Sequence, residues 1–225
     1  MKYAYDLHIH SVLSPCADVL MTPNNIFNMA KLKKLDIIAV TDHNSLKQLP
    51  ICKELSKSYD MLFVPGVEIT VRENFDVLCY FKTVEDAMRF DKMIENYIVH
   101  DKQDNPNLKK QEILNIDDEV IDIYPYDLSS PLRLSIYELQ EILVPFEHIL
   151  VFAHIDRTYR SGKSMINQIN HHAVEFTKHE SNQNNIALFN SDAHQITDIL
   201  ERTEANVISL DQLDIEHFFA YFNHD

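Results

Sequence analysis

Five short segments of the chain carry histidine, aspartate or glutamate at spacings that suit metal binding. The first is Asp6-Leu7-His8-Ile9-His10. In a β-strand, side chains two residues apart point the same way, so His8 and His10 can converge on one ion. The pattern His-x-His is short and common, so two ordinary histidines on a polar strand face are the competing interpretation.

Two further segments place ionisable residues directly after apolar runs. Asp42 and His43 follow the run at residues 37–40, where His43 is a candidate ligand and Asp42 can orient its ring. A capping turn before the next helix explains the same residues without a metal. Glu68 stands between valine and isoleucine, where a carboxylate is costly unless a metal ion or a cation such as Arg72 pairs with it.

The last two segments again follow apolar runs. His154 is a candidate ligand, and Arg157 is a candidate for a planar, bidentate phosphate contact. A surface pair between Asp156 and Arg157 is the alternative. Asp192 and His194 repeat the two-residue spacing of the first segment, with one carboxylate and one imidazole.

The elements around these segments have to bring them together. Hydrophobic periodicity predicts strands at residues 3–8, 36–41, 61–65, 76–81, 148–153, 186–190 and 207–210. It predicts helices at residues 22–35, 45–59, 83–99, 135–143, 164–178 and 197–202. Such alternation favours an α/β fold with a parallel sheet, most simply a barrel, whose sites collect at the carboxyl ends of the strands.

The middle of the chain interrupts this alternation. Residues 100–131 are predicted to be an irregular insertion, with a hairpin formed by residues 112–116 and 120–124. The length of 225 residues suits one domain of residues 1–225.

The composition excludes several classes of function. The net charge of −15 opposes binding of a long polyanion unless bound cations supply positive charge. Two glycines are too few for a glycine-rich phosphate loop or a dinucleotide fingerprint. The three cysteines indicate a reducing compartment rather than a disulfide framework. With neither an apolar run of membrane-spanning length nor a secretory signal, we expect a cytoplasmic protein with no membrane partner.

The five segments, in this order, resemble those of the PHP (polymerase and histidinol phosphatase) superfamily. The matching motifs are His8-x-His10, Thr41-Asp42-His43, Gly66-x-Glu68, His154 shortly before Arg157, and Asp192-x-His194. The resemblance spans nearly the whole chain. It implies a distorted (β/α)7 barrel that holds two or three divalent ions, zinc, manganese or iron, at the C-terminal ends of its strands.

Two positions depart from the family pattern. Many members have a Ser-Asp-Gly turn after the first motif, and counting back from Thr22-Pro23 places Asp18 where that aspartate would be, with Cys16 as a less favoured substitute. Members often have a histidine where this chain has Asp76. An aspartate at this position would add a hard oxygen donor that favours manganese or iron, or would leave one ion weakly held.

The resemblance also implies phosphoester hydrolysis by a metal-activated hydroxide. We expect a small phosphomonoester such as a nucleotide as substrate, with Arg157 holding its phosphate and Asp42 as a candidate proton donor to the leaving group. Two alternatives stay open: an exonuclease acting on short oligonucleotides, and a non-catalytic metal-binding module.

Overall fold

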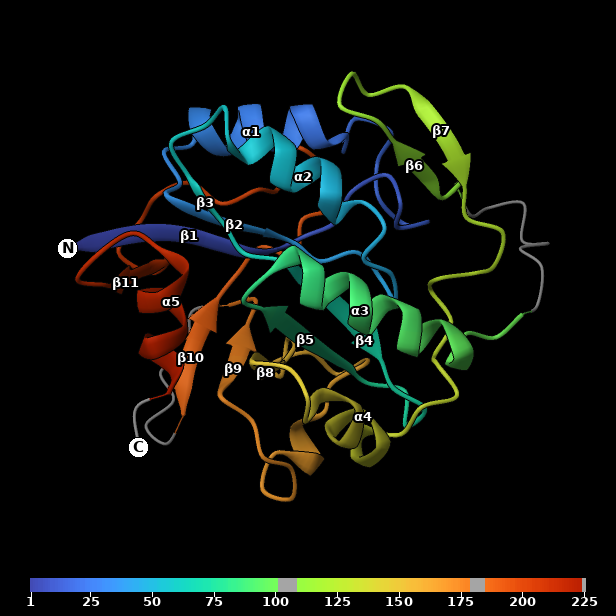
Figure 1. Ribbon diagram of the computed structural model, residues 1–225. Helices are drawn as coiled ribbons and strands as arrows, with labels where there is room; N and C mark the ends of the chain where they lie inside the picture. The colour runs from blue at the N-terminus through green and yellow to red at the C-terminus, as the bar shows by residue number, and fades with distance from the viewer. Residues whose placement is uncertain (101–108, 179–184, 224–225) are drawn as a thin grey trace.

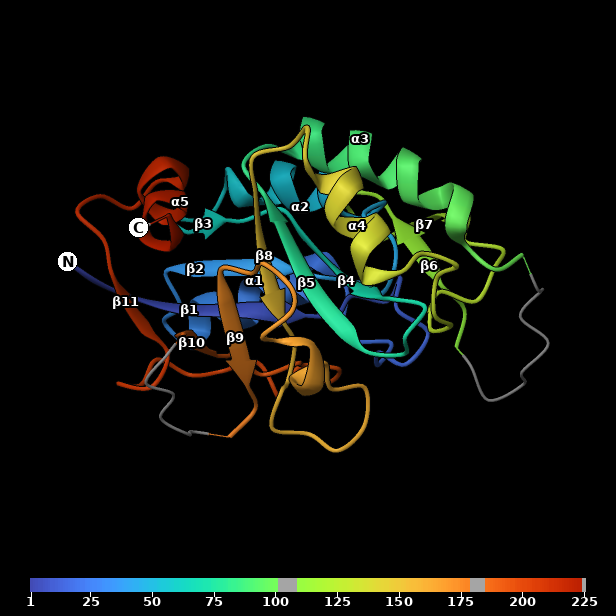
Figure 2. The same cartoon turned by 90° about the horizontal axis from the view of Figure 1, so that it is seen from below.

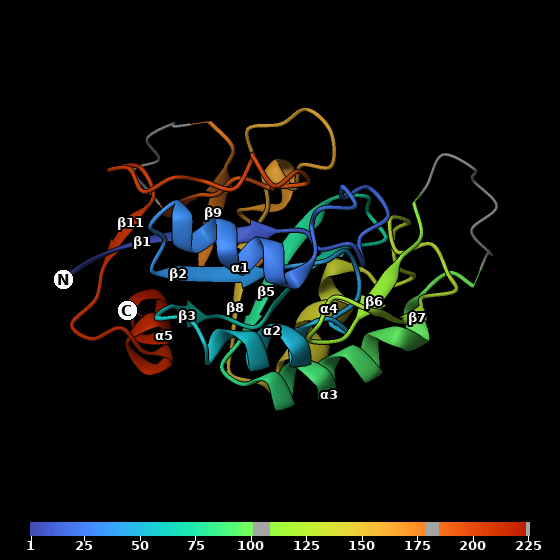
Figure 3. The same ribbon diagram turned by 90° about the horizontal axis from the view of Figure 1, so that it is seen from above.

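A computed structural model describes residues 1–100, 109–178 and 185–223. Its elements form a mixed α/β fold in which helices lie outside two sheets (Figure 1). The views in Figures 2 and 3 place β11 (Val207–Ser209) and α5 (Ile215–Phe222) at one end of the molecule and the hairpin of β6 (Glu112–Leu114) and β7 (Val120–Ile123) at the other. In this part of the chain, no helix combines the length and apolar character needed to cross a membrane.

The first sheet has the strand order β11-β1-β2-β3. Its members are β1 (Lys2–Ile9), β2 (Ile37–Val40), β3 (Leu62–Phe63) and β11 (Val207–Ser209). The strands β1, β2 and β3 run parallel, whereas β11 pairs antiparallel with β1. The predicted strands at residues 3–8, 36–41, 61–65 and 207–210 are therefore all present, with slightly different ends.

The second sheet has the order β10-β9-β8-β5-β4. Its members are β4 (Gly66–Thr70), β5 (Asp76–Phe81), β8 (His148–Phe152), β9 (Ala173–Phe176) and β10 (Ile186–Phe189). The strand β5 runs antiparallel to both β4 and β8, which differs from the predicted parallel sheet. The short turn between β4 and β5 explains the difference, because only antiparallel neighbours can be joined by so few residues.

The two sheets meet at two isolated bridges. Ile9 at the end of β1 bridges Ala193, and His43, just after β2, bridges Glu68 in β4. Both bridges lie beside predicted site residues, so the site occupies the place where the sheets approach each other. Among the described residues, these single bridges rather than continuous ladders connect the sheets, and the predicted closed (β/α)7 barrel stays a prediction.

Three helices begin at or next to their predicted first residues, whereas the helix predicted at residues 45–59 begins only at Leu49. Thr22, Thr83 and Ser135 each accept a hydrogen bond from a backbone N–H of the first turn. The helices are α1 (Pro23–Leu32), α2 (Leu49–Ser56), α3 (Val84–Ile94), α4 (Ile136–Leu143) and α5 (Ile215–Phe222), with short 3-10 turns at Glu95–Tyr97 and Lys163–Met165.

Two predicted helices are wrong. Residues 164–178 contain only the end of a 3-10 turn and then β9, and residues 197–202 form turns. The strand β9 pairs with β8 and β10, and these pairings between distant segments override the local helical spacing of apolar residues.

The predicted hairpin in the insertion is confirmed. β6 (Glu112–Leu114) and β7 (Val120–Ile123) pair antiparallel around Asp118, which has a left-handed backbone with φ 60°. The preceding residues 101–108, also within the predicted insertion, lie outside the described residues.

A local irregularity in β1 turns the histidine motif toward the site. Tyr5 and Leu7 pack in the apolar cluster between the two sheets. Between Asp6 and Ile9, β1 gains one residue against β2, since Asp6 pairs with Ile38 but Ile9 pairs with Val40. Such a bulge reverses the alternation of side chains. The odd-numbered Tyr5 and Leu7 and the even-numbered His8 and His10 can therefore all face inward along one strand.

The glycine that opens β4 is required by close packing. A Cβ atom at Gly66 would lie 2.8 Å from Tyr80 Cδ1 and 2.9 Å from Thr41 Cγ2. The Tyr80 ring is held in place because its hydroxyl donates to the carbonyl of Leu7. We expect Gly66→Ala to lower the free energy of unfolding by about 1–3 kcal/mol, measured by chemical denaturation. A loss below about 0.5 kcal/mol, the range of neutral surface changes, would contradict this packing argument.

Candidate metal centre

Eight of the nine predicted ligands come together at the strand ends. Their donor atoms form three overlapping groups, each with all its atoms within 4.8 Å of one another. The groups are His10, His43 and His194; His8, His10, Glu68 and Asp192; and Glu68, Asp76 and His154. Because His10 and Glu68 each belong to two groups, the arrangement is continuous and offers places for up to three ions.

In the central group, His8, His10 and Glu68 are buried and Asp192 is partly buried. His10 Nε2 lies 3.0 Å from Asp192 Oδ1 and 3.3 Å from Glu68 Oε2. His8 Nε2 lies 3.2 Å from His10 Nε2 and 3.3 Å from Glu68 Oε1. The predicted convergence of the His8 and His10 side chains is therefore present.

The carboxylate-rich group lies between β4, β5 and the end of β8. His154 Nε2 is 3.1 Å from Glu68 Oε1 and 3.5 Å from Asp76 Oδ2. The other oxygen of Asp76 accepts a hydrogen bond from Thr70 Oγ1 at 2.6 Å. Asp76 thus keeps one oxygen toward the cluster.

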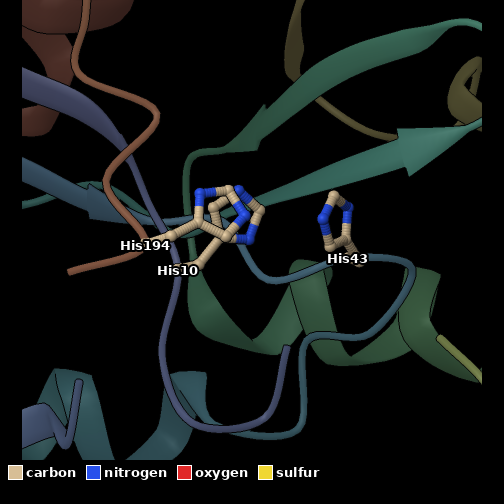
Figure 4. Close-up of side chains that lie close together, drawn as sticks. All are labelled: His10, His43 and His194. Atoms are coloured by element: carbon tan, nitrogen blue, oxygen red, sulfur yellow. The ribbon is translucent and has the colours of Figure 1, made fainter. Parts of the chain in front are cut away.

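The third group consists of imidazoles. Figure 4 shows that His10, His43 and His194 come from three separate chain segments. The ring centroid of His10 is 4.4 Å from that of His43 and 4.2 Å from that of His194. The thiol of Cys16 lies beside this group, with Sγ 3.1 Å from His194 Nε2.

Asp18 is the predicted ligand that the structure does not bring to the cluster. Its Oδ1 accepts from the backbone N–H of Leu20, and its Oδ2 lies 3.4 Å from Lys109 Nζ. Its backbone N–H donates to the carbonyl of His194, so the loop passes the site while the carboxylate points elsewhere. Counting positions from Thr22 located the loop but did not determine which of its side chains faces inward.

Asp42, predicted as a proton donor, is buried beside the cluster with its carboxylate hydrogen-bonded to two serines. Its carboxylate is 2% exposed and accepts from Ser11 N, Ser11 Oγ and Ser14 Oγ at 2.6–2.7 Å. The Ser14 hydroxyl in turn contacts His10 Nδ1 at 3.0 Å. The Asp42 carboxylate is thus linked to His10 through Ser14, and its role as a proton donor stays a prediction.

Sequence reasoning missed Glu175 in β9. This buried carboxylate contacts His8 Nδ1 at 3.0 Å, and accepts from the backbone N–H of His154 at 2.9 Å and from Asn190 Nδ2 at 2.7 Å. It therefore orients two candidate ligands from behind. The sequence does contain a signal, a carboxylate within the apolar run Ala173-Val174-Glu175-Phe176. Because this segment was predicted to be helical, Glu175 was not recognised as a strand residue near the site.

The two arginines after β8 contact carboxylates of the cluster. Arg157 Nη1 donates to Asp192 Oδ2 at 2.6 Å, and its side chain is 41% exposed. The more buried Arg160 has Nη1 3.8 Å from Asp76 Oδ1 and donates to Thr70 Oγ1. Arg157 therefore stands at the solvent side of the cluster, where an incoming anion can reach it.

Three site loops leave their strands through left-handed backbone. Asn44, His154 and Asp192 follow β2, β8 and β10 with φ of 52°, 31° and 51°. Non-glycine residues in this region cost about 1–3 kcal/mol each and persist where surrounding contacts hold them. The bond from His154 N to Glu175 is one such contact.

The electrostatics of the cluster favour protonated imidazoles in the metal-free protein. Burial lowers the pKa of His8, but Glu175, Glu68 and Asp192 outweigh it and raise this pKa well above 6.5. The pKa of His43 is likewise raised well above 6.5, mainly by Glu68 against burial. Burial raises the pKa of Glu68, but the imidazoles of His8 and His43 hold it well below 4.5.

Two atoms of the cluster have the character of metal ligands. His43 Nδ1 and Glu68 Oε2, 2.9 Å apart, are buried and lack a hydrogen-bond partner of good geometry. Buried polar atoms are normally satisfied, so orphaned ones in a shared space point to a missing partner. Imidazole and carboxylate donors suit zinc, manganese and iron, so the residues present fit divalent ions.

Metal uptake is expected to release protons. Ions bind deprotonated histidine, so protons held by His8 and His43 must leave. The apparent affinity should rise with pH above 6.5, by about tenfold per pH unit for each proton displaced. Calorimetric titration with Zn²⁺ in buffers of different ionisation enthalpy checks this. A binding enthalpy that is the same in all buffers would contradict it.

Comparison with known proteins gives a family match. The PHP domain profile matches residues 6–188. Over 76 residues, the chain is 38% identical to the 5'-3' exoribonuclease Rnm of Salmonella typhimurium, covering 32% of this chain and 25% of that protein. It is 34% identical over 76 residues to an uncharacterized protein of Methanocaldococcus jannaschii, covering 30% of this chain and 44% of that protein. The aligned part is thus less than half the length of either relative.

Two solved structures share the fold. The lesion-specific endonuclease Q of Pyrococcus furiosus superposes with a TM-score of 0.68 at 21% identity, covering 97% of this chain and 55% of that one. A metal-dependent phosphoesterase, named as putative, from Bifidobacterium adolescentis superposes with a TM-score of 0.56 at 16% identity, covering 98% and 96%. At these identities the likeness concerns the fold.

Proposed function

This chain belongs to the PHP domain family, and from that premise we propose that it is a metal-dependent hydrolase of phosphoester bonds. The observation that carries the proposal is the convergence of eight predicted ligands into three overlapping groups. They come from six segments distant in sequence, which ordinary surface histidines would not do.

We assign eight residues as ligands of two or three divalent ions. They are His8, His10, His43, Glu68, Asp76, His154, Asp192 and His194. Glu68 is the candidate bridge, because each of its oxygens lies near different imidazoles. When bound, the ions would neutralise charge on the phosphate and acidify a water molecule enough to lose its proton near neutral pH.

Arg157 is proposed to bind the phosphate group. Its guanidinium is half-exposed at the edge of the cluster and already contacts Asp192. A planar guanidinium can hold one carboxylate oxygen and still present N–H groups to a phosphate. Arg157 would thereby orient the substrate and stabilise the charge that develops during hydrolysis.

The fold around the site is proposed to be a distorted form of the family barrel. The bridges Ile9–Ala193 and His43–Glu68 join the two sheets on both sides of the cluster. We further propose that residues 1–225 are one PHP domain, with residues 100–131 as an insertion.

The first candidate substrate is a small phosphomonoester, such as a nucleotide. The net charge of −15 favours it, because the protein repels a long polyanion beyond the reach of the bound cations.

The second candidate is a short oligonucleotide, cleaved from one end. The names of two relatives support it, an exoribonuclease and a lesion-specific endonuclease. A short strand would place a single phosphate at the cluster and leave few others near the acidic surface.

One screen separates these candidates. The protein, loaded with Zn²⁺, Mn²⁺ or Fe²⁺, is given p-nitrophenyl phosphate, nucleoside monophosphates, sugar phosphates and end-labelled oligonucleotides of graded length. Release of inorganic phosphate from monoesters supports the first candidate, and stepwise shortening of oligonucleotides supports the second. Metal binding without turnover of any substrate would favour a non-catalytic metal-binding module and overturn the enzymatic proposal.

A further inference from the structure

A cysteine lies at the edge of the imidazole group. Cys16 Sγ is 3.1 Å from His194 Nε2. The chain has three cysteines, and Cys52 and Cys79 are buried while Cys16 is exposed. The family position nearest in sequence, Asp18, has its carboxylate at Leu20 and Lys109 instead.

The loop that carries Cys16 is held on both sides. Ala17 N donates to the carbonyl of Ser14 at 3.0 Å, and Asp18 N donates to the carbonyl of His194 at 2.8 Å. The Ser14 hydroxyl is itself bound to Asp42. The position of the thiol beside His194 is therefore set by backbone contacts on either side of it, rather than by a free loop.

A second observation points to a ligand at this place. His43 is 6% exposed, and its Nδ1 lacks a hydrogen-bond partner of good geometry. Together with His10 and His194 it offers nitrogen atoms within 4.8 Å of one another. Glu68 or Asp192 lies near each of these imidazoles, but the group itself consists of three nitrogen donors, which leaves room for a further ligand.

We propose that Cys16 is the fourth ligand of an ion held by His10, His43 and His194, and that it makes this a zinc-preferring site. The proposal rests on the metal centre proposed above. A thiolate with three imidazoles is a soft to borderline donor set that favours zinc. The group of Glu68, Asp76 and His154 at the other end is richer in hard oxygen donors, which suit manganese or iron. The two ends of the cluster would therefore select different metals.

Cobalt substitution tests the ligand directly, without measuring activity. The metal-free protein is titrated with Co²⁺ and its absorption spectrum recorded. We expect a sulfur-to-cobalt charge-transfer band in the near ultraviolet, which disappears in Cys16→Ser. Cys52→Ala, which alters a buried cysteine in α2, is the matched control and should keep the band.

Thiol reactivity gives an independent measurement. In the folded metal-free protein, only the exposed Cys16 should react rapidly with a thiol reagent, and stoichiometric Zn²⁺ should protect it. Cys16→Ser should weaken zinc binding by at least the roughly 10–100-fold that loss of an outer-shell partner causes. Cys16→Asp should restore binding with a preference shifted toward Mn²⁺.

The outcomes separate this inference from the metal centre itself. Suppose that Co²⁺ binds and gives ligand-field bands but no charge-transfer band, and that Zn²⁺ does not protect the thiol. This result would overturn the role of Cys16 but leave the proposed metal centre intact. A protein that binds no Co²⁺ or Zn²⁺ at all would overturn both.

Discussion

Replacing Glu68 with glutamine is expected to remove at least one metal ion per chain and nearly all hydrolysis. Glu68 approaches four imidazoles, with His43 Nδ1 at 2.9 Å and His154 Nε2 at 3.1 Å as the shortest contacts. It belongs to two of the three donor groups, so its loss affects both. Glutamine keeps the shape of the side chain but removes its charge and one acceptor oxygen.

The size of the effect follows from what bound ions contribute to phosphate hydrolysis. Lewis-acid stabilisation supplies several kcal/mol, which corresponds to a rate lower by about 100- to 1000-fold. Metal content per chain and the rate on the best substrate of the screen are the two measurements. Both should fall together, while circular dichroism shows a folded protein.

An exposed carboxylate provides the control for Glu68. Glu204 pairs with Lys2 at the surface, and Glu204→Gln removes the same charge from the chain far from the cluster. It should leave metal content and rate unchanged. A Glu68→Gln protein that stays folded and hydrolyses its substrate at the original rate would refute the assignment of this metal centre.

Replacing Glu175 with glutamine is expected to weaken metal binding while leaving every proposed ligand in place. Glu175 holds His8 Nδ1, the backbone N–H of His154 and Asn190 Nδ2. Partners that orient ligands in this way contribute about 10–100-fold to metal affinity. Glutamine has a single acceptor oxygen for these three donors, so the His8 ring loses its fixed orientation.

A positioning role for Glu175 predicts a distinct pattern of results. The dissociation constant for Zn²⁺, measured by chelator competition, should rise about 10–100-fold. Saturating metal should restore much of the rate, which it would not do after loss of a ligand. Asp36→Asn is the matched control, because the carboxylate of Asp36 also accepts a hydrogen bond from a backbone N–H. Asp36 precedes β2 and therefore lies at the opposite end of this strand from His43. Unchanged zinc affinity in Glu175→Gln would show that Glu175 serves only the packing of β9.

Much of the site could be predicted because its residues follow apolar strands. His43, His154 and Asp192 each come directly after a buried run, and the carboxyl ends of such strands lie together in α/β folds. Local patterns also predicted that helices start at Thr22, Thr83 and Ser135, since helix starts depend on capping residues within one turn.

The errors lie where distant contacts decide the local structure. Glu175 was assigned to a helix, yet its segment is a strand because β8 and β10 lie on either side of it. The partners of the Asp42 carboxylate, Ser11 and Ser14, were likewise not predicted. Neither set of partners is close in sequence, so no local pattern reveals them.

The sequence by itself predicted eight of the residues that form the cluster of imidazoles and carboxylates, because donor type and strand-exit position are local properties. Only the tertiary structure decided which side chains face inward. The extra residue in β1 brings His8 and His10 toward the site, and the contacts of the loop at residues 14–18 place Cys16 rather than Asp18 beside His194. A side chain's direction depends on hydrogen bonds to segments far along the chain, and these form only when the whole fold is assembled.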